Sequence, residues 1–259
     1  MSTLVKVLVL CAWVTAAAAA EPLDIQSYRD VHARFSQLLV AADSGSAIDL
    51  RTPEFNRLVK VLSDEKRFLY ARRLATEDIP SMMDMCELAD RATDELVLFG
   101  AKSRKLSPED KARLRTLQEQ NILVFQPELT LVQPFHIRCL GLTVPLLEEF
   151  VGTLPPAQVN QARRDGLKSM SEGYSNMMRG TFMMADDARY GLKYRLALIK
   201  AMADATPAFA SMLSVEQRRR VLSVVDGAAS RAPPEGAADL ARIRRALNST
   251  TCARLCALQ

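Results

Sequence analysis

The sequence contains few of the residues that most often build catalytic and metal sites. It has two histidines, His32 and His136, and a single tryptophan, Trp13. Two histidines cannot supply a three-histidine metal centre, and a cysteine–histidine catalytic pair would have to use one of them. The motifs of serine hydrolases, zinc proteases, phosphate-binding loops and dinucleotide-binding domains are also missing. We therefore expect no cofactor, and the sequence does not decide whether the protein is an enzyme.

Long apolar runs and strand patterns are missing as well. A membrane-spanning helix needs about 20 apolar residues, and the best candidate after the N-terminus, CLGLTVPLLEEFV, is interrupted by Pro145, Glu148 and Glu149. Alternating runs rich in Val, Ile and Thr do not occur, whereas apolar residues recur at intervals of three and four, as on one face of a helix. The pattern predicts an all-α, bundle-like domain of about eight to nine helices, with no integral membrane span after residue 20.

The first residues have the composition of a secretory signal peptide. The segment MSTLVKVLVLCAWVTAAAAA contains one basic residue, Lys6, then a short apolar run and a series of alanines. We predict that residues 1–20 are removed by cleavage after Ala20 and that the mature protein is exported, either periplasmic or secreted. Because Trp13 lies in this segment, the mature chain is predicted to have no tryptophan.

Four cysteines follow the predicted cleavage site. An even number of cysteines in an exported protein indicates disulfides, and four cysteines allow three pairings. We favour Cys86 with Cys139 and Cys252 with Cys256; the alternative is that the C-terminal cysteines pair with Cys86 or Cys139. Residues four apart on a helix lie near the upper limit of the Cα separation of a disulfide, so the second bond requires a tail that is not a regular helix.

Caps and apolar stripes divide the chain into helical segments. We expect helices at about 24–42, from 53 onwards, and at about 78–99, 108–124, 145–151, 155–184 and 186–203, with further starts at Pro207 and Ser214. Three prolines, at 127, 134 and 145, predict a broken connector with short helical turns between Gln126 and Pro145. Residues 21–229 are predicted to form one helical domain, and residues 230–259 a linker, a short Arg-rich helix and a cysteine-containing tail.

Two helix starts share a common pattern. Residues 106–110 and 213–217 both have the form Leu-Ser-x-Glu-polar. This form predicts a capping box, in which Ser caps a helix and the polar residue three positions later returns a hydrogen bond. The second segment also resembles the Leu-Thr-x-x-Gln signature of small periplasmic stress chaperones. The resemblance implies a non-enzymatic, helical, periplasmic protein.

Positive and negative charges are nearly balanced. The chain has 34 Lys and Arg residues against 30 Asp and Glu residues, a net charge of +4, and both signs are interspersed. We therefore interpret clusters such as Arg218, Arg219 and Arg220 as a solvated helix face. No nucleic-acid partner is expected for an exported protein of this kind.

A ladder of glycine and methionine runs through the segment GLKSMSEGYSNMMRGTFMM. Steps of four and three alternate and keep its members on one stripe of a helix: Gly166, Met170, Gly173, Met177, Gly180 and Met184. Each glycine costs up to about 1 kcal/mol of helix stability relative to alanine, so the close approach of a helix or a ligand must compensate. We predict either a closely packed seam, which Gly173→Leu would overpack, or a surface for a partner. Polar residues off the stripe, including Ser171 and Ser175, are predicted to face water.

The sequence leaves three functions open. We favour a non-enzymatic binding protein for a protein or apolar ligand. The first alternative is a periplasmic copper-handling protein, because thioethers bind Cu(I) and Met170, Met177 and Met184 share the ladder stripe. The second alternative is an enzyme whose site cannot be read from the sequence. The oligomeric state is left open.

Overall fold

The computed structural model describes residues 23–43, 50–101, 108–229, 231–249, 251–252 and 255–259. Within these ranges the chain forms ten α-helices and no strand, so the predicted all-α fold is confirmed. The helices are α1 (Ile25–Asp43), α2 (Pro53–Leu62), α3 (Glu65–Phe68), α4 (Ile79–Val97), α5 (Pro108–Val124), α6 (Gln126–Thr153), α7 (Gln161–Asp186), α8 (Leu192–Met212), α9 (Val215–Ala229) and α10 (Ala237–Ser249). No helix of the described chain is both long and apolar enough to cross a membrane. The predicted signal peptide, residues 1–20, lies outside the described residues.

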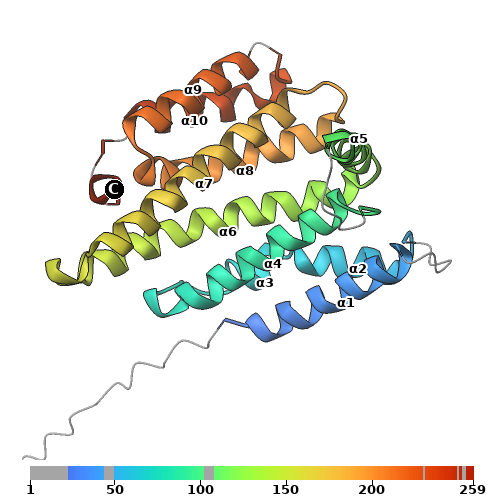
Figure 1. Ribbon diagram of the computed structural model, residues 1–259, viewed down its shortest axis with the longest axis horizontal. Helices are drawn as coiled ribbons and strands as arrows, with labels where there is room; N and C mark the ends of the chain where they lie inside the picture. Colours follow the sequence, from blue (N-terminus) through green and yellow to red (C-terminus); the bar gives the residue numbers. More distant parts are fainter. Residues whose placement is uncertain (1–22, 44–49, 102–107, 230, 250, 253–254) are drawn as a thin grey trace, which may run out of the picture.

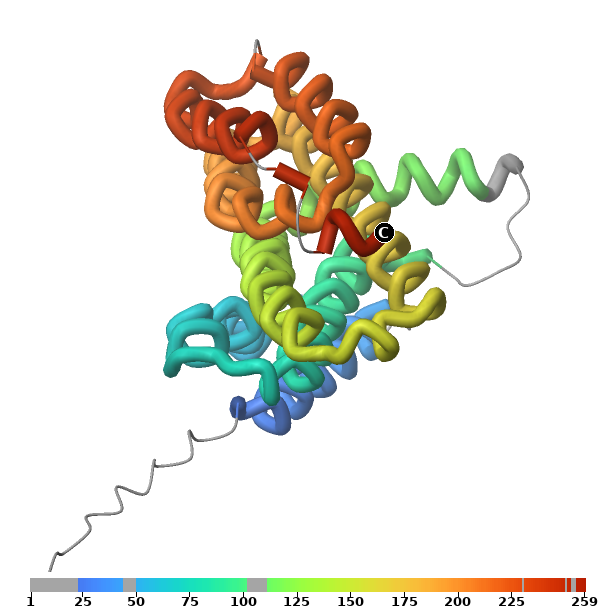
Figure 2. Tube along the Cα trace, turned by 90° about the vertical axis from the view of Figure 1, so that its left-hand side faces the viewer, coloured from blue at the N-terminus to red at the C-terminus, as the bar shows by residue number. Residues whose placement is uncertain are grey.

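The helices are arranged in layers around α6 (Figure 1). α4 packs against one side of α6, and α8 packs against the other. α1 and α2 form an outer layer on the α4 side, while α9 and α10 cover α7 and α8. α5 projects from the body of the bundle, as a second view shows (Figure 2). One cluster of buried apolar side chains runs through these layers.

Aromatic rings fix the first helices to α6. The ring of Tyr28 in α1 lies 4.9 Å from that of Phe68 in α3 and 5.6 Å from that of Phe135 in α6. The Tyr28 hydroxyl donates a hydrogen bond to the carbonyl of Leu62 at 3.0 Å, so its polar atom is satisfied inside the core. Burial of a large apolar side chain contributes about 1.5 to 3 kcal/mol. These three rings therefore form a stable centre for the N-terminal half.

The segment from Gln126 to Pro145 is not a broken connector, and that prediction is wrong. It belongs to α6, a continuous helix of 28 residues with Pro134 and Pro145 inside it. A proline in a helix interior removes a backbone hydrogen bond and costs about 3 kcal/mol or more. Pro134 is buried, and α4 and α8 pack against α6 on opposite sides. Tertiary packing of this kind overrides a local preference.

Several helix ends agree with the predicted caps. The Thr52 hydroxyl accepts a hydrogen bond from the backbone N–H of Phe55 at 3.1 Å. At the start of α9, the Ser214 N–H donates to the Gln217 side chain at 2.7 Å and the Gln217 N–H donates to the Ser214 hydroxyl at 3.2 Å. This is the predicted capping box. Gly100, which follows α4, has a φ of 81° that favours glycine.

Other boundaries differ from the predictions. Pro207 lies inside α8 and does not start a helix. Both α7 and α8 begin later than predicted. α7 begins at Gln161, directly after the N-cap Asn160, and α8 begins at Leu192. The predicted cap at Ser107 lies outside the described residues.

Both favoured disulfides are present. Cys86 and Cys139 join α4 to α6 with their Cα atoms 5.5 Å apart, and Cys252 and Cys256 close a small ring in the tail with their Cα atoms 5.3 Å apart. The tail has left the α-helical conformation, as the second bond requires, because α10 ends at Ser249.

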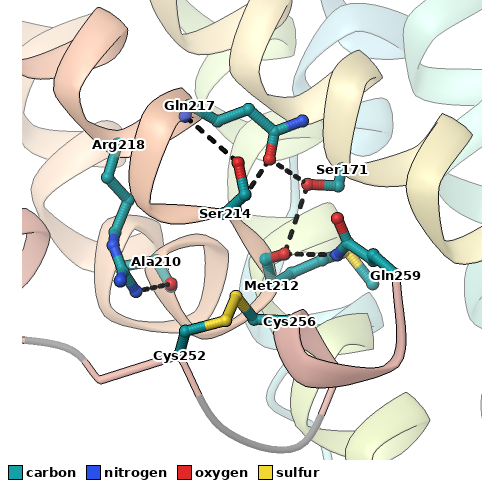
Figure 3. Close-up of a disulfide and its surroundings, with 9 residues drawn as sticks. All are labelled: Ser171, Ala210, Met212, Ser214, Gln217, Arg218, Cys252, Cys256 and Gln259. Carbon is teal, nitrogen blue, oxygen red and sulfur yellow. Dashed lines mark hydrogen bonds between the residues drawn. A yellow bond between two sulfur atoms is a disulfide. The ribbon is translucent and has the colours of Figure 1, made fainter.

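The C-terminal tail returns to the bundle (Figure 3). The side-chain amide of Gln259 donates to the carbonyl of Met212 at 2.6 Å, and the Arg164 guanidinium donates to the carbonyl of Leu258 at 3.2 Å. Leu255 is buried. The tail is thus held by α7 and the end of α8, although its disulfide is internal.

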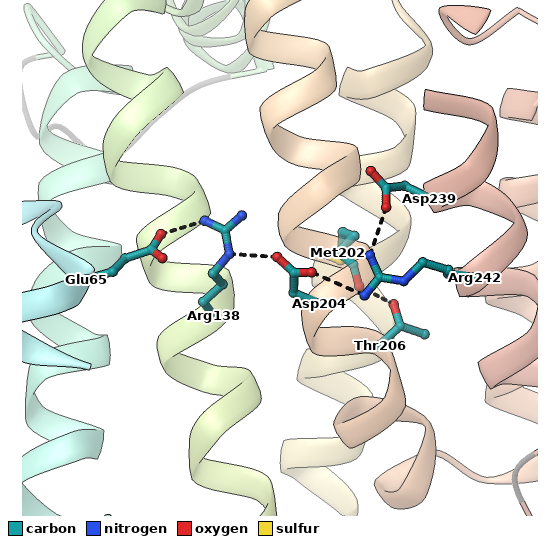
Figure 4. A network of polar contacts seen from close by, with 7 residues as sticks. All are labelled: Glu65, Arg138, Met202, Asp204, Thr206, Asp239 and Arg242. Atoms are coloured by element: carbon teal, nitrogen blue, oxygen red, sulfur yellow. Dashed lines mark hydrogen bonds and ion pairs between the residues drawn. The ribbon is translucent and has the colours of Figure 1, made fainter. Parts of the chain in front are cut away.

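A chain of ion pairs crosses one side of the bundle (Figure 4). Arg138 of α6 contacts Glu65 of α3 at 2.5 Å and Asp204 of α8 at 3.1 Å. Arg242 of α10 contacts Asp204 at 3.3 Å and Asp239 at 2.9 Å. The Arg-rich helix α10 is therefore bound to α8 through charges as well as apolar contacts.

One of the clustered arginines is not on a solvated face. Arg218 is buried, and its guanidinium donates to the carbonyl of Ala210 at 3.1 Å. Burial lowers the pKa of Arg218. Arg219 and Arg220 are exposed, as predicted. The cluster thus combines one buried hydrogen-bond donor near the end of α8 with two surface charges.

Candidate functional site

An open groove of about 660 Å³ lies between α4, α6 and α7. This volume is within the range of about 300 to 1,000 Å³ that ligand sites occupy. The residues lining it are mainly apolar, acidic or sulfur-containing: Pro80, Met83, Asp84, Cys86, Glu87 and Asp90 from α4; His136, Leu140 and Thr143 from α6; and Met170, Gly173, Tyr174 and Met177 from α7. We call this feature the α4–α6–α7 groove.

Half of the predicted glycine–methionine ladder lies in this groove, namely Met170, Gly173 and Met177. A Cβ atom added to Gly166, Gly173 or Gly180 would meet no heavy atom within 4 Å. No helix of the described chain therefore packs against these three glycines, and the prediction that they form a closely packed seam is wrong. Gly173 instead leaves the α7 wall of the groove without a side chain between Met170 and Met177.

α7 packs on the core through a different face, which includes two serines predicted to be solvated. Ser171 and Ser175 are 0% and 3% exposed. The Ser171 hydroxyl donates to the Gln217 side chain at 2.6 Å and lies 3.2 Å from the carbonyl of Met212 (Figure 3). A small polar side chain can be buried when a neighbouring element supplies its hydrogen-bond partner. That partner comes from α9, which the sequence of α7 does not reveal.

The methionines divide between the groove and the interior. Met184, a predicted alternative metal ligand, has its sulfur 3.7 Å from the Tyr194 hydroxyl of α8 and does not line the groove. Met83 of α4, which is 46% exposed, lines the groove together with Met170 and Met177. The thioethers that share a site are thus Met83, Met170 and Met177, from two helices.

His136 and Asp90 meet at the groove. Nδ1 of His136 lies 3.4 Å from Oδ1 of Asp90, and 13% of the His136 side chain is exposed. Burial lowers the pKa of His136 to about 4. The pKa of Asp90 is raised, first by partial burial and then by the nearby charge of Glu87. At neutral pH this pair is therefore a neutral imidazole beside a carboxylate.

The α4 side of the groove is acidic. Asp84, Glu87 and Asp90 line it, and no Lys or Arg is among the lining residues. Arg29 binds Asp84, with Nε 2.7 Å from Oδ2, and Arg91 binds Glu87. Within the described chain no Lys or Arg side chain pairs with Asp90. Asp90 is therefore the carboxylate that remains available to a ligand.

The groove residues do not form an activated nucleophile. The sulfur of Cys86 is bonded to that of Cys139, and the Thr143 hydroxyl donates to the carbonyl of Leu140 at 2.7 Å. Burial raises the pKa of Tyr174, which keeps its hydroxyl protonated. Over the described ranges, no cluster of three or more His, Cys, Asp or Glu residues could hold a metal ion.

A second cavity, of about 720 Å³, lies between the end of α6, the turn before α7 and the C-terminal tail. Leu255 and Leu258 of the tail form part of its wall, together with Val151 and Leu154. This cavity contains none of the residues predicted as ligands. We therefore place the candidate site in the α4–α6–α7 groove.

The chain matches no known family profile, and no curated protein or solved structure is detectably similar to it. Function must therefore be argued from the groove itself. Sequence reasoning missed that His136 and Met83 share a site with the ladder. The favoured pairing of Cys86 with Cys139 could have predicted this. His136 lies three residues before Cys139, so the disulfide brings it close to the methionines that precede Cys86.

Proposed function

We propose that the protein is an exported, non-enzymatic binding protein and that the α4–α6–α7 groove holds the apolar part of its ligand. The observation that carries this proposal is the convergence of Met83, Met170 and Met177 on one open groove. Methionine side chains are flexible and polarisable, and they adapt to varied apolar ligands. Two disulfides and the composition of residues 1–20 support export, since such bonds persist in oxidising compartments.

A neutral fluorescent probe tests the binding proposal. We expect N-phenyl-1-naphthylamine to bind the protein and its emission to increase. Gly173→Leu places a side chain in the groove, and its Cβ would meet no heavy atom within 4 Å. We expect this change to weaken probe binding about tenfold, equivalent to roughly 1.4 kcal/mol.

Gly166→Leu is the matched control. Gly166 lies on the same helix, and a Cβ atom added there would also meet no heavy atom within 4 Å, but Gly166 does not line the groove. This variant should bind the probe like the parent protein. Equal binding by the parent and Gly173→Leu, or no binding by the parent, would exclude the groove as the ligand site.

Copper handling is a second candidate, favoured by one observation. Three thioethers, from Met83, Met170 and Met177, line the same groove as His136. Cu(I) prefers soft thioether ligands and also binds neutral imidazole. The low pKa of His136 keeps its imidazole neutral over the whole range above about 4.

Metal analysis after anaerobic Cu(I) loading tests this candidate. We expect one retained ion per chain, loss of retention in Met170→Leu and Met177→Leu, and full retention in Met184→Leu, whose side chain contacts Tyr194 instead. Retention that is absent, or equal in all variants, would eliminate a copper site in the groove.

A further inference from the structure

The groove is acidic on a chain that is basic as a whole. The net charge of the sequence is +4, yet the charged residues lining the groove are Asp84, Glu87 and Asp90. Arg29 and Arg91 neutralise the first two from outside the groove. The charge that remains for a ligand is that of Asp90, whose side chain is 57% exposed.

Among the described residues, no Lys or Arg side chain forms an ion pair with Asp90. Asp90 contacts His136, whose Nδ1 lies 3.4 Å from its Oδ1, and burial lowers the pKa of His136 to about 4, so the imidazole is neutral at physiological pH. Partial burial and the charge of Glu87 raise the pKa of Asp90, so the carboxylate is less stable there than in water. A cation delivered by a ligand would relieve this cost, because an opposite charge within a few ångström favours the ionised carboxylate.

The shape of the groove fits an elongated partner. Its α4 wall runs from Pro80 to Asp90, which is about 15 Å of helix and close to three helical turns. On the α7 wall, Gly173 leaves no side chain between Met170 and Met177. An open groove with apolar walls of this length suits the apolar face of an amphipathic helix, and its acidic edge suits a basic residue beside that face.

We infer that the groove binds a basic amphipathic helix of a partner protein, whose apolar side chains pack on Met83, Met170 and Met177 and whose Lys or Arg side chain pairs with Asp90. This inference rests on the proposed binding function. It adds the class of the ligand and identifies Asp90 as the residue that selects for positive charge. Methionine at the contact allows one groove to accept helices that differ in sequence.

Two fluorescein-labelled helical peptides of equal length and identical leucine stripe test the inference. One carries Lys on its polar face and the other carries Glu. In fluorescence anisotropy titrations we expect the Lys peptide to bind at least about tenfold more tightly than the Glu peptide, and the difference to shrink as salt is raised. Asp90→Asn should weaken binding of the Lys peptide about tenfold.

Asp94→Asn is the matched control. Asp94 lies one turn further along α4 and carries the same charge, but it does not line the groove. This variant should bind the Lys peptide within about twofold of the parent, because screening weakens charges that make no direct contact.

The outcomes separate this inference from the function on which it rests. If the neutral probe binds but the two peptides bind equally, or if Asp90→Asn has no effect, the inference fails and the binding function stands. If dodecyltrimethylammonium displaces the probe in an Asp90-dependent way and neither peptide binds, a small cationic amphiphile replaces the helix and the inference fails. If the probe does not bind, both proposals fail.

Discussion

Gly141 of α6 lies so close to Ala205 of α8 that a Cβ atom at position 141 would be 2.7 Å from the Cβ of Ala205. The two central helices thus touch at a point that has no room for a side chain. We expect Gly141→Leu to lower the free energy of unfolding by about 1 to 3 kcal/mol or more through overpacking. Urea denaturation monitored by circular dichroism measures this change.

Gly173→Leu is the corresponding substitution in α7, where no atom lies within 4 Å of the added Cβ. Leucine favours helix over glycine by up to about 1 kcal/mol, so we expect unchanged or slightly higher stability. A loss as large as that of Gly141→Leu would show that α7 is packed at Gly173 after all.

Acidification is expected to destabilise the protein through its two histidines. The folded-state pKa of His136 is lowered to about 4 by burial, against about 6.5 in the unfolded chain. Stability from this group is fully present above pH 6.5 and is lost as the pH falls towards 4, by up to about 3 kcal/mol. Burial lowers the pKa of His32 as well, which adds to the effect.

The difference between the parent and His136→Gln isolates this contribution. The raised pKa of Asp90 has the opposite effect, because protonation of this group stabilises the folded state and partly offsets the loss. Because the variant lacks the imidazole of His136, its free energy of unfolding in urea should decrease less from pH 7 to pH 4 than that of the parent. If the free energy of unfolding depended on pH in the same way for both proteins, His136 would have the same pKa in the folded and unfolded states.

The two disulfides should differ in their contribution to stability. Cys86 and Cys139 are 53 residues apart, and the loop-entropy relation assigns about 4 kcal/mol to a loop of this length. Cys252 and Cys256 are 4 residues apart, and the same relation gives about 2 kcal/mol. Double Cys→Ala variants compared by urea denaturation measure both values.

The first disulfide also joins the α4 and α6 walls of the groove, so its removal should weaken binding of the neutral probe. Removal of the second should not, because the tail lies outside the groove. Equal effects of the two double variants on probe binding would contradict this assignment.

Export makes a prediction that needs no variant. Protein recovered from the periplasm of a bacterial host should begin at Glu21, lack tryptophan emission and show two disulfides in its non-reduced intact mass. Tryptophan emission from tag-free protein would show that Trp13 is retained and that cleavage after Ala20 does not occur.

Features that depend on neighbouring residues in the chain could be predicted. The cap at Thr52, the capping box of Ser214 and Gln217, and the glycine that follows α4 all involve residues within a few positions of one another. The pairing of Cys86 with Cys139 could be favoured from the cysteine count and spacing alone. Predictions failed where a second element changes the local balance, as at Pro134 and in the face that α7 buries.

The amino-acid sequence by itself determined that the chain is helical, where several of its helices begin, and that its four later cysteines pair in two bonds, because these follow from local propensity, capping and residue spacing. Only the tertiary structure decided which stripe of α7 faces the core. Ser171 can be buried because Gln217 of α9 accepts its hydrogen bond, and this leaves Met170, Gly173 and Met177 at the surface beside α4. The groove is formed by helices far apart in the sequence, and its acidic edge, its histidine and its methionines come together only when those helices pack.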